Sequence, residues 1–139
     1  MTNLGDMVSF DQTVPVNKRE LLLRKTVKDV DIGTSPTVVL GPLPISAASK
    51  VTIFYSNTGS QEHTVKVYAW ICDVSGTALT PPPTTETDEN VKLIKTMTVA
   101  SGEVSDPVTI AGEFDGIFVL AYASSADSEA GNVFVKGKK

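Results

Sequence analysis

The chain has 139 residues, of which 41% are hydrophobic and 20% are charged, and its formal net charge at pH 7 is −4. This length suits one compact domain, and the apolar content excludes a disordered chain. Cys72 is the only cysteine, so no intrachain disulfide can form. No stretch is apolar enough for a membrane helix, so we expect no membrane partner.

Residues 1–17 contain scattered apolar side chains without a helical period, and Pro15 favours an extended path. We predict an extended N-terminal arm over 1–17, with a disordered tail as the alternative, and a single domain over 18–139. The start of the chain has no basic region followed by an apolar one, so we expect no signal peptide. An extended segment can add to a sheet edge, which makes the apolar arm residues candidate intersubunit contacts: Met7, Val8, Phe10, Val14 and Val16.

The first half of the remaining chain contains several short segments that favour strands. Residues 18–30 fit either a helical stripe or a strand, and the strand-rich surroundings favour the strand. Residues 37–40 form a short strand, and the two prolines within 41–44 exclude a central strand position. Clear alternation over 50–57 and 63–71, separated by a turn at 57–60, predicts an antiparallel hairpin.

The second half begins with a long loop over 73–90, which contains three consecutive prolines and an acidic stretch over 84–90. Strands are predicted over 91–99, 107–110, 117–123 and 133–136, with a polar loop at 124–132. Residues 117–123 are apolar on both faces, as in a central strand that is covered on both sides. About eight short strands and no required helix predict an all-β fold, an antiparallel β-sandwich. Its strand order, jelly-roll-like or immunoglobulin-like, stays open.

The basic residues form two groups that lie far apart in the sequence. Acidic Glu20 and Asp29 interleave with the first group, so both groups are interpreted as solvated surface rather than a binding patch. We therefore expect no nucleic-acid partner, although the short C-terminal tail suits a negatively charged partner. The first group comprises Lys18, Arg19, Arg24, Lys25 and Lys28, and the second comprises Lys136, Lys138 and Lys139.

Groups that perform catalysis are few. His63 is the only histidine, and we expect it to be a solvent-facing residue at a strand start. A buried, inert thiol is expected for Cys72. One cysteine and one histidine cannot supply four zinc ligands, and the loop carboxylates lack the spacing of a calcium loop. We predict no catalytic residue, no metal site and no cofactor, and hence no enzyme.

Tyr68 and Trp70 share one predicted strand face with Thr64 and Lys66. Exposed aromatic side chains on a sandwich face can stack on sugar rings, which makes Tyr68 and Trp70 a candidate sugar or partner face. The favoured interpretation places Trp70 in the core or in a subunit interface, because aromatic residues dominate such burial.

The layout of short hairpins over 91–135 carries a resemblance. A strand is followed by Ser101-Gly102-Glu103, then by residues 107–110, and then by the segment Glu113-Phe114-Asp115-Gly116-Ile117-Phe118-Val119. This layout resembles the small β-sandwich decoration or auxiliary capsid proteins of tailed bacteriophages. The resemblance implies a non-enzymatic virion protein that assembles in the host cytoplasm and stabilises the capsid surface. It also implies a homo-oligomer, with a trimer favoured, and the major capsid protein or other virion proteins as partners. The alternative is a carbohydrate-binding or adhesion module that uses the aromatic pair.

Overall fold

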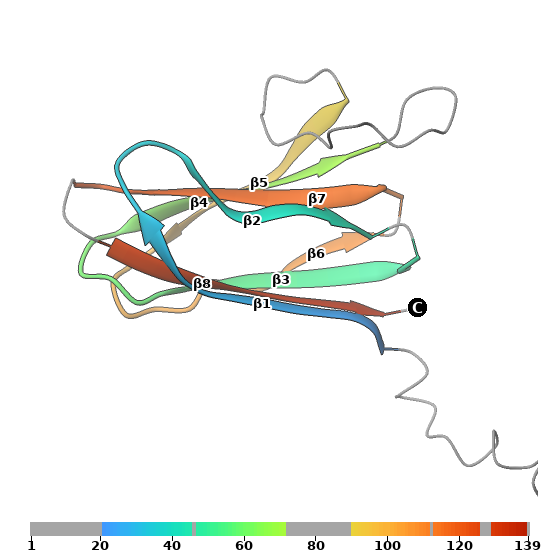
Figure 1. Cartoon of the computed structure of the whole chain (residues 1–139), viewed down its shortest axis with the longest axis horizontal. Coiled ribbons are helices and arrows are strands. Elements are labelled where there is room, and N and C mark those ends of the chain that lie inside the picture. The colour runs from blue at the N-terminus through green and yellow to red at the C-terminus, as the bar shows by residue number, and fades with distance from the viewer. Residues whose placement is uncertain (1–20, 46, 72–89, 112, 126–128, 139) are drawn as a thin grey trace, which may run out of the picture.

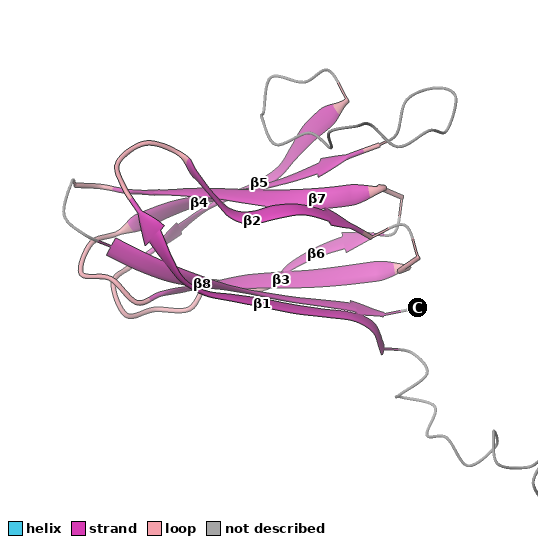
Figure 2. Ribbon diagram, in the orientation of Figure 1, coloured by secondary structure: helices cyan, strands magenta, loops and turns pink. Residues whose placement is uncertain are grey.

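The computed structural model describes residues 21–45, 47–71, 90–111, 113–125 and 129–138, which form eight strands and no helix (Figures 1 and 2). Consequently, these residues include no helix that could cross a membrane. The predicted arm over 1–17 and Cys72 lie outside the described residues. The strands are β1 Leu21–Ile32, β2 Thr37–Pro44, β3 Lys50–Asn57, β4 His63–Trp70, β5 Val91–Val99, β6 Val108–Ala111, β7 Gly116–Ala123 and β8 Glu129–Lys138.

The strands form two four-stranded sheets that face each other (Figure 1). One sheet has the order β1-β8-β3-β6 and the other has the order β2-β7-β4-β5, and all neighbouring strands are antiparallel. This order is that of a jelly roll. The predicted all-β sandwich is confirmed, and of the two strand orders left open the structure has the first.

The predicted hairpin of residues 50–57 and 63–71 is wrong, although both strands exist. β3 pairs with β6 and β8, whereas β4 pairs with β5 and β7 in the opposite sheet. The turn between them therefore crosses from one sheet to the other. Alternation specifies which face of a strand is buried, and two strands can bury their apolar faces against each other across the core as well as side by side.

Three strands differ from the predictions by two residues or more at one end or both. The ambiguous segment 18–30 is a strand in its described part, and β1 extends to Ile32. β2 continues through both prolines to Pro44, because it lies at the edge of its sheet and pairs with β7 alone. β8 begins at Glu129, so the last part of the predicted polar loop at 124–132 is strand.

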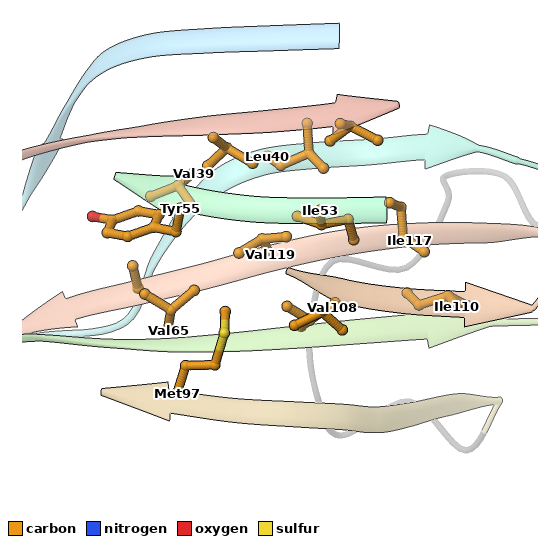
Figure 3. Close-up of a cluster of buried hydrophobic side chains, with 14 of the residues drawn as sticks. Val39, Leu40, Ile53, Tyr55, Val65, Met97, Val108, Ile110, Ile117 and Val119 are labelled. Atoms are coloured by element: carbon orange, nitrogen blue, oxygen red, sulfur yellow. The ribbon is translucent and has the colours of Figure 1, made fainter. Parts of the chain in front are cut away.

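The main core lies between the two sheets, where side chains from both sheets point toward one another (Figure 3). β3 contributes Val51, Ile53 and Tyr55, and β4 contributes Val65 and Val67 from the opposite side. Residues 116–121 of β7 are all buried, which confirms the predicted central strand with two covered faces. The outward-facing side chains of β7 belong to a second, smaller apolar cluster, whose buried members are Tyr68, Trp70, Phe118 and Leu120.

Candidate functional site

Strand pairing brings the two distant basic groups together on one sheet. β8 lies between β1 and β3, and Arg24 is the register partner of Lys136 while Lys50 is the register partner of Lys138. In β3 and β8 the odd-numbered residues face the core, so the even-numbered ones point outward. Like charges therefore stand directly opposite each other on the outer face of this sheet.

Two aromatic rings continue this surface along the same strands. Phe54 and Phe134 are register partners, and their rings stack with centroids 5.1 Å apart and an interplanar angle of 27°. Phe54 remains 37% exposed, which is unusual for a ring of this size. The outer face thus combines positive charge with an exposed apolar surface.

An open groove of about 500 Å³ lies on this face, and no carboxylate among the described residues lines it. Its lining residues in that part of the chain are Arg24, Thr26, Thr52, Phe54, Phe134, Val135, Lys136 and Lys138. Within the described ranges the one ion pair joins His63 to Glu129, so the cations Arg24, Lys50, Lys136 and Lys138 have no acidic partner there. We call this surface the basic face and define it by Arg24, Lys50, Phe54, Phe134, Lys136 and Lys138. Its chemistry suits a partner that is negatively charged and offers some apolar contact.

A chain of buried polar groups lies inside the opposite end of the sandwich. Tyr55 Oη lies 2.8 Å from His63 Nδ1, and His63 Nε2 lies 2.9 Å from Glu129 Oε1. The side chains of His63 and Glu129 are both 0% exposed. The expectation of a solvent-facing His63 is therefore wrong. We call Tyr55, His63 and Glu129 the buried polar cluster.

Glu129 is held as a carboxylate by donors around it. Burial opposes its ionisation, but the backbone N–H groups of Gln61 and Ser60, the His63 ring and the Ser60 hydroxyl donate to it, and together they lower its pKa to about 2. Burial and the Glu129 charge raise the pKa of Tyr55, which keeps its hydroxyl protonated. We therefore assign a proton to His63 Nε2, which donates to Glu129, while Nδ1 accepts from Tyr55.

Two glycines make room for the buried polar cluster. A Cβ at Gly131 would collide with the Tyr55 hydroxyl and ring, and a Cβ at Gly59 would lie 2.7 Å from Glu129 Cδ. Because the cluster is sealed from solvent, a substrate cannot reach it. Its hydrogen bonds instead fasten the turn at 58–62 to β8, so its role is structural.

The aromatic candidates from the sequence do not form an open face. Tyr68 is 3% exposed and Trp70 is 4% exposed. Tyr68 stacks on Phe118 with ring centroids 5.0 Å apart, and the Trp70 ring covers Gly116 so closely that a Cβ there would lie 2.6 Å from Cε2. No ring surface of this pair is free to stack on a sugar, which agrees with the interpretation of Trp70 as a buried residue.

The other sequence-based candidates are placed as follows. The arm residues Met7, Val8, Phe10, Val14 and Val16 lie outside the described residues. Within the described ranges, no group of three or more histidine, cysteine, aspartate or glutamate side chains could hold a metal ion. The basic face was not predicted from the sequence, although Lys50 and Phe54 occupy outward-facing positions of the alternating segment 50–56.

No family model and no curated protein matches the sequence. Among solved structures, a protein of Bacillus endospore appendages, described as disulfide-linked pili, is similar over 91% of this chain and 96% of its own, with 16% identity and a TM-score of 0.46. A protein derived from the SPBc2 prophage is similar over 81% of this chain and 93% of its own, with 16% identity and a TM-score of 0.41. The Tobacco streak virus coat protein is similar over 91% of this chain and 90% of its own, with 9% identity and a TM-score of 0.38.

Proposed function

We propose that this chain is a non-enzymatic structural protein of a virion, a decoration protein that binds the capsid surface and stabilises it. The observation that supports this proposal is that the acid–base groups are buried, whereas the exposed side chains include large apolar and basic ones. The groups suited to acid–base work, His63 and Glu129, are 0% exposed and bonded within the protein. The exposed surfaces of the described residues carry instead large apolar side chains and the basic face, whose cations have no acidic partner within that part of the chain, and such surfaces suit adhesion.

Large hydrophobic side chains are exposed at several separate places on the surface. Two of them, Val38 and Leu93, are 40% and 45% exposed and lie on β2 and β5, the two edge strands of one sheet. Others are Phe54, Ile71 and Val104. Burial of such residues in subunit contacts contributes about 25 cal/mol per Å² of apolar surface removed from water, which is the energy source of a protein that works by binding neighbours.

The edge strands supply a second means of attachment. β1 is 12 residues long and pairs only with β8, so the backbone groups on its other side have no partner strand among the described residues. An extended segment from a neighbouring subunit can pair with such an edge. We propose that the arm over 1–17 performs this role and contributes the contacts of Met7, Val8, Phe10, Val14 and Val16. The proposed partners are further copies, with a trimer favoured, and the major capsid protein or other virion proteins.

The test compares the full chain with a chain that lacks residues 1–17, by light scattering and by co-sedimentation with purified capsids. We expect the deletion to reduce both oligomer mass and capsid binding. A full-length variant with its five apolar arm residues changed to serine separates arm chemistry from arm length, and a variant with Thr2 and Gln12 changed to alanine is the control. Unchanged oligomer mass and unchanged capsid binding after the deletion would refute the role of the arm.

A further inference from the structure

Exposed carboxylates gather at the end of the sandwich opposite the basic face. Asp31, near the end of β1, is the register partner of Ala130, and Ala130 O accepts a hydrogen bond from Thr58 N at 3.2 Å. Glu62 closes the same turn, and Glu103 O accepts from Asn57 N at 2.9 Å. All three carboxylate residues are exposed. We call Asp31, Glu62 and Glu103 the acidic rim.

The turns that carry the acidic rim have no positive charge of their own, and the cation nearest to Asp31 along β1 is the exposed Lys28, three residues earlier. The connections that surround the rim, residues 33–36, 58–62 and 100–105, contain no lysine or arginine. His63 at the start of β4 is buried and bonded to Glu129, so it presents no charge to the surface. The rim is therefore an acidic surface, and it is built on turns that are hydrogen-bonded to β3 and β8.

The basic face is electrostatically unfavourable in an isolated subunit. Arg24 and Lys136 stand opposite each other, and so do Lys50 and Lys138. Like charges directly opposite on one sheet face destabilise the pair. Glu113 is the exposed carboxylate nearest in the topology, on the connection that follows β6, and no ion pair joins it to the described cations. An anionic partner would relieve the repulsion.

We propose that the basic face of one copy binds the acidic rim of a second copy, head to tail. Charge complementarity selects this occupant, because the same chain carries both surfaces and they lie toward opposite ends of β8. Phe54 and Phe134 add apolar contact at the centre of the interface, where aromatic residues contribute most. The net charge of −4 disfavours a strongly anionic polymer such as nucleic acid as the partner.

A contact between two different surfaces is heterologous, so it forms a ring if the rotation between copies closes and a filament if it does not. A ring of three copies would agree with the trimer of the proposed function. The inference rests on the proposed function only in placing this contact in a virion, because the contact itself does not involve the arm.

The test is a charge exchange, measured by sedimentation velocity at about 50 mM and about 500 mM salt. We expect association of the wild-type chain to weaken as salt increases. Reversal of the basic face (K136E/K138E) and reversal of the acidic rim (D31K/E103K) should each raise the dissociation constant about tenfold or more. A 1:1 mixture of the two variants should restore association, because each then offers the other a complementary surface.

The control is K92E/K95E, which changes the net charge by the same amount on exposed residues of β5, in the opposite sheet. It should associate like the wild type. Circular dichroism and cooperative unfolding establish that every variant is folded. If folded reversal variants associate normally, or if their mixture does not associate, the proposal is wrong.

Two further outcomes would overturn the inference. A monomeric wild-type chain at low salt would exclude the head-to-tail contact. Binding of a single-stranded oligonucleotide through Lys136 and Lys138 by a chain that stays monomeric would identify nucleic acid as the ligand instead. If arm deletion dissolves the oligomer while both reversals leave it intact, the proposed function stands and this inference falls.

Discussion

Replacement of Gly131 by alanine tests the packing of the buried polar cluster. An ideal Cβ at this position would collide with Tyr55 Oη and Cζ and would lie 2.9 Å from Cε1. The ring cannot swing into solvent, because Tyr55 is 0% exposed and its hydroxyl is bonded to His63. Either the ring or β8 must shift, and overpacking of this kind costs about 1–3 kcal/mol.

The shift also stretches or breaks the hydrogen bond between Tyr55 and His63. A buried nitrogen that loses its partner costs about 1–3 kcal/mol. The smaller backbone entropy of unfolded alanine offsets about 0.4–1 kcal/mol of this loss. We therefore expect Gly131→Ala to lower the free energy of unfolding by about 2–4 kcal/mol, a large fraction of the stability of a typical domain.

Urea unfolding of Gly131→Ala and of a matched control measures this effect. The control is Gly41→Ala in β2, where a Cβ would meet nothing within 4 Å and the backbone has no positive φ. It should be neutral or slightly stabilising. A Tyr55→Leu change in the Gly131→Ala background removes the colliding atoms, so the two losses should not add. Equal stability of Gly131→Ala and Gly41→Ala would refute the packing argument.

Three further predictions concern the buried polar cluster and the basic face. Tyr55→Phe should lower the free energy of unfolding by about 1–3 kcal/mol, because His63 Nδ1 loses its donor. Because the pKa of Glu129 is lowered from 4.5 to about 2, its ionised form stabilises the fold above pH 4.5, and this stabilisation is lost as pH falls toward 2. The stability difference between wild type and Glu129→Gln should therefore shrink between pH 5 and pH 2 in acid-titrated urea unfolding. Lys138→Thr should stabilise the monomer by about 0.2–0.5 kcal/mol, because it removes the like-charge pair of Lys50 and Lys138. Urea unfolding of dilute protein in buffer without added salt measures this effect.

Each of these predictions has a control and a result that contradicts it. Tyr122→Phe removes a hydroxyl from a partly exposed residue and should be neutral, and a similar effect of both tyrosine changes would argue against the bond to His63. A Glu129→Gln difference that stays constant from pH 5 to pH 2 would mean that the carboxylate is not ionised in the fold. Lys92→Thr on β5 is the control for Lys138→Thr, and loss of stability in Lys138→Thr would show that the opposed charges are not in conflict.

Period-two alternation predicted where the strands lie, but not their partners. It identified β3, β4 and β7 almost to the residue, because each buries one or both faces in a core of valine, isoleucine and aromatic side chains. It could not show that β3 and β4 belong to different sheets. Partner choice depends on contacts across the whole core, which short segments do not encode.

One member of the buried polar cluster, His63, has a signal for burial in the sequence. His63 is in phase with Val65, Val67 and Ala69, all of which face the core, so alternation alone places it inward. Its place at the strand start, next to the polar turn that contains Gln61 and Glu62, favoured the opposite expectation. Glu129 lies 66 residues away in the sequence, and only the fold brings its carboxylate to the ring. The basic face was missed for the same reason, since its cations come from three strands that are distant in the chain.

β8 links the buried polar cluster and the acidic rim at one end of the sandwich to the basic face at the other. Glu129, its first residue, anchors the turn that presents Glu62, and Lys136 and Lys138 at its other end belong to the basic face. A strand of 10 residues spans about 30 Å at about 3.3 Å per residue. β8 is paired on both sides, with β1 and β3, so it does not bend freely and the separation between the two surfaces is fixed. Head-to-tail contact between copies would therefore repeat at a regular spacing that β8 helps to set, and a looser attachment through the arm alone would impose no such spacing.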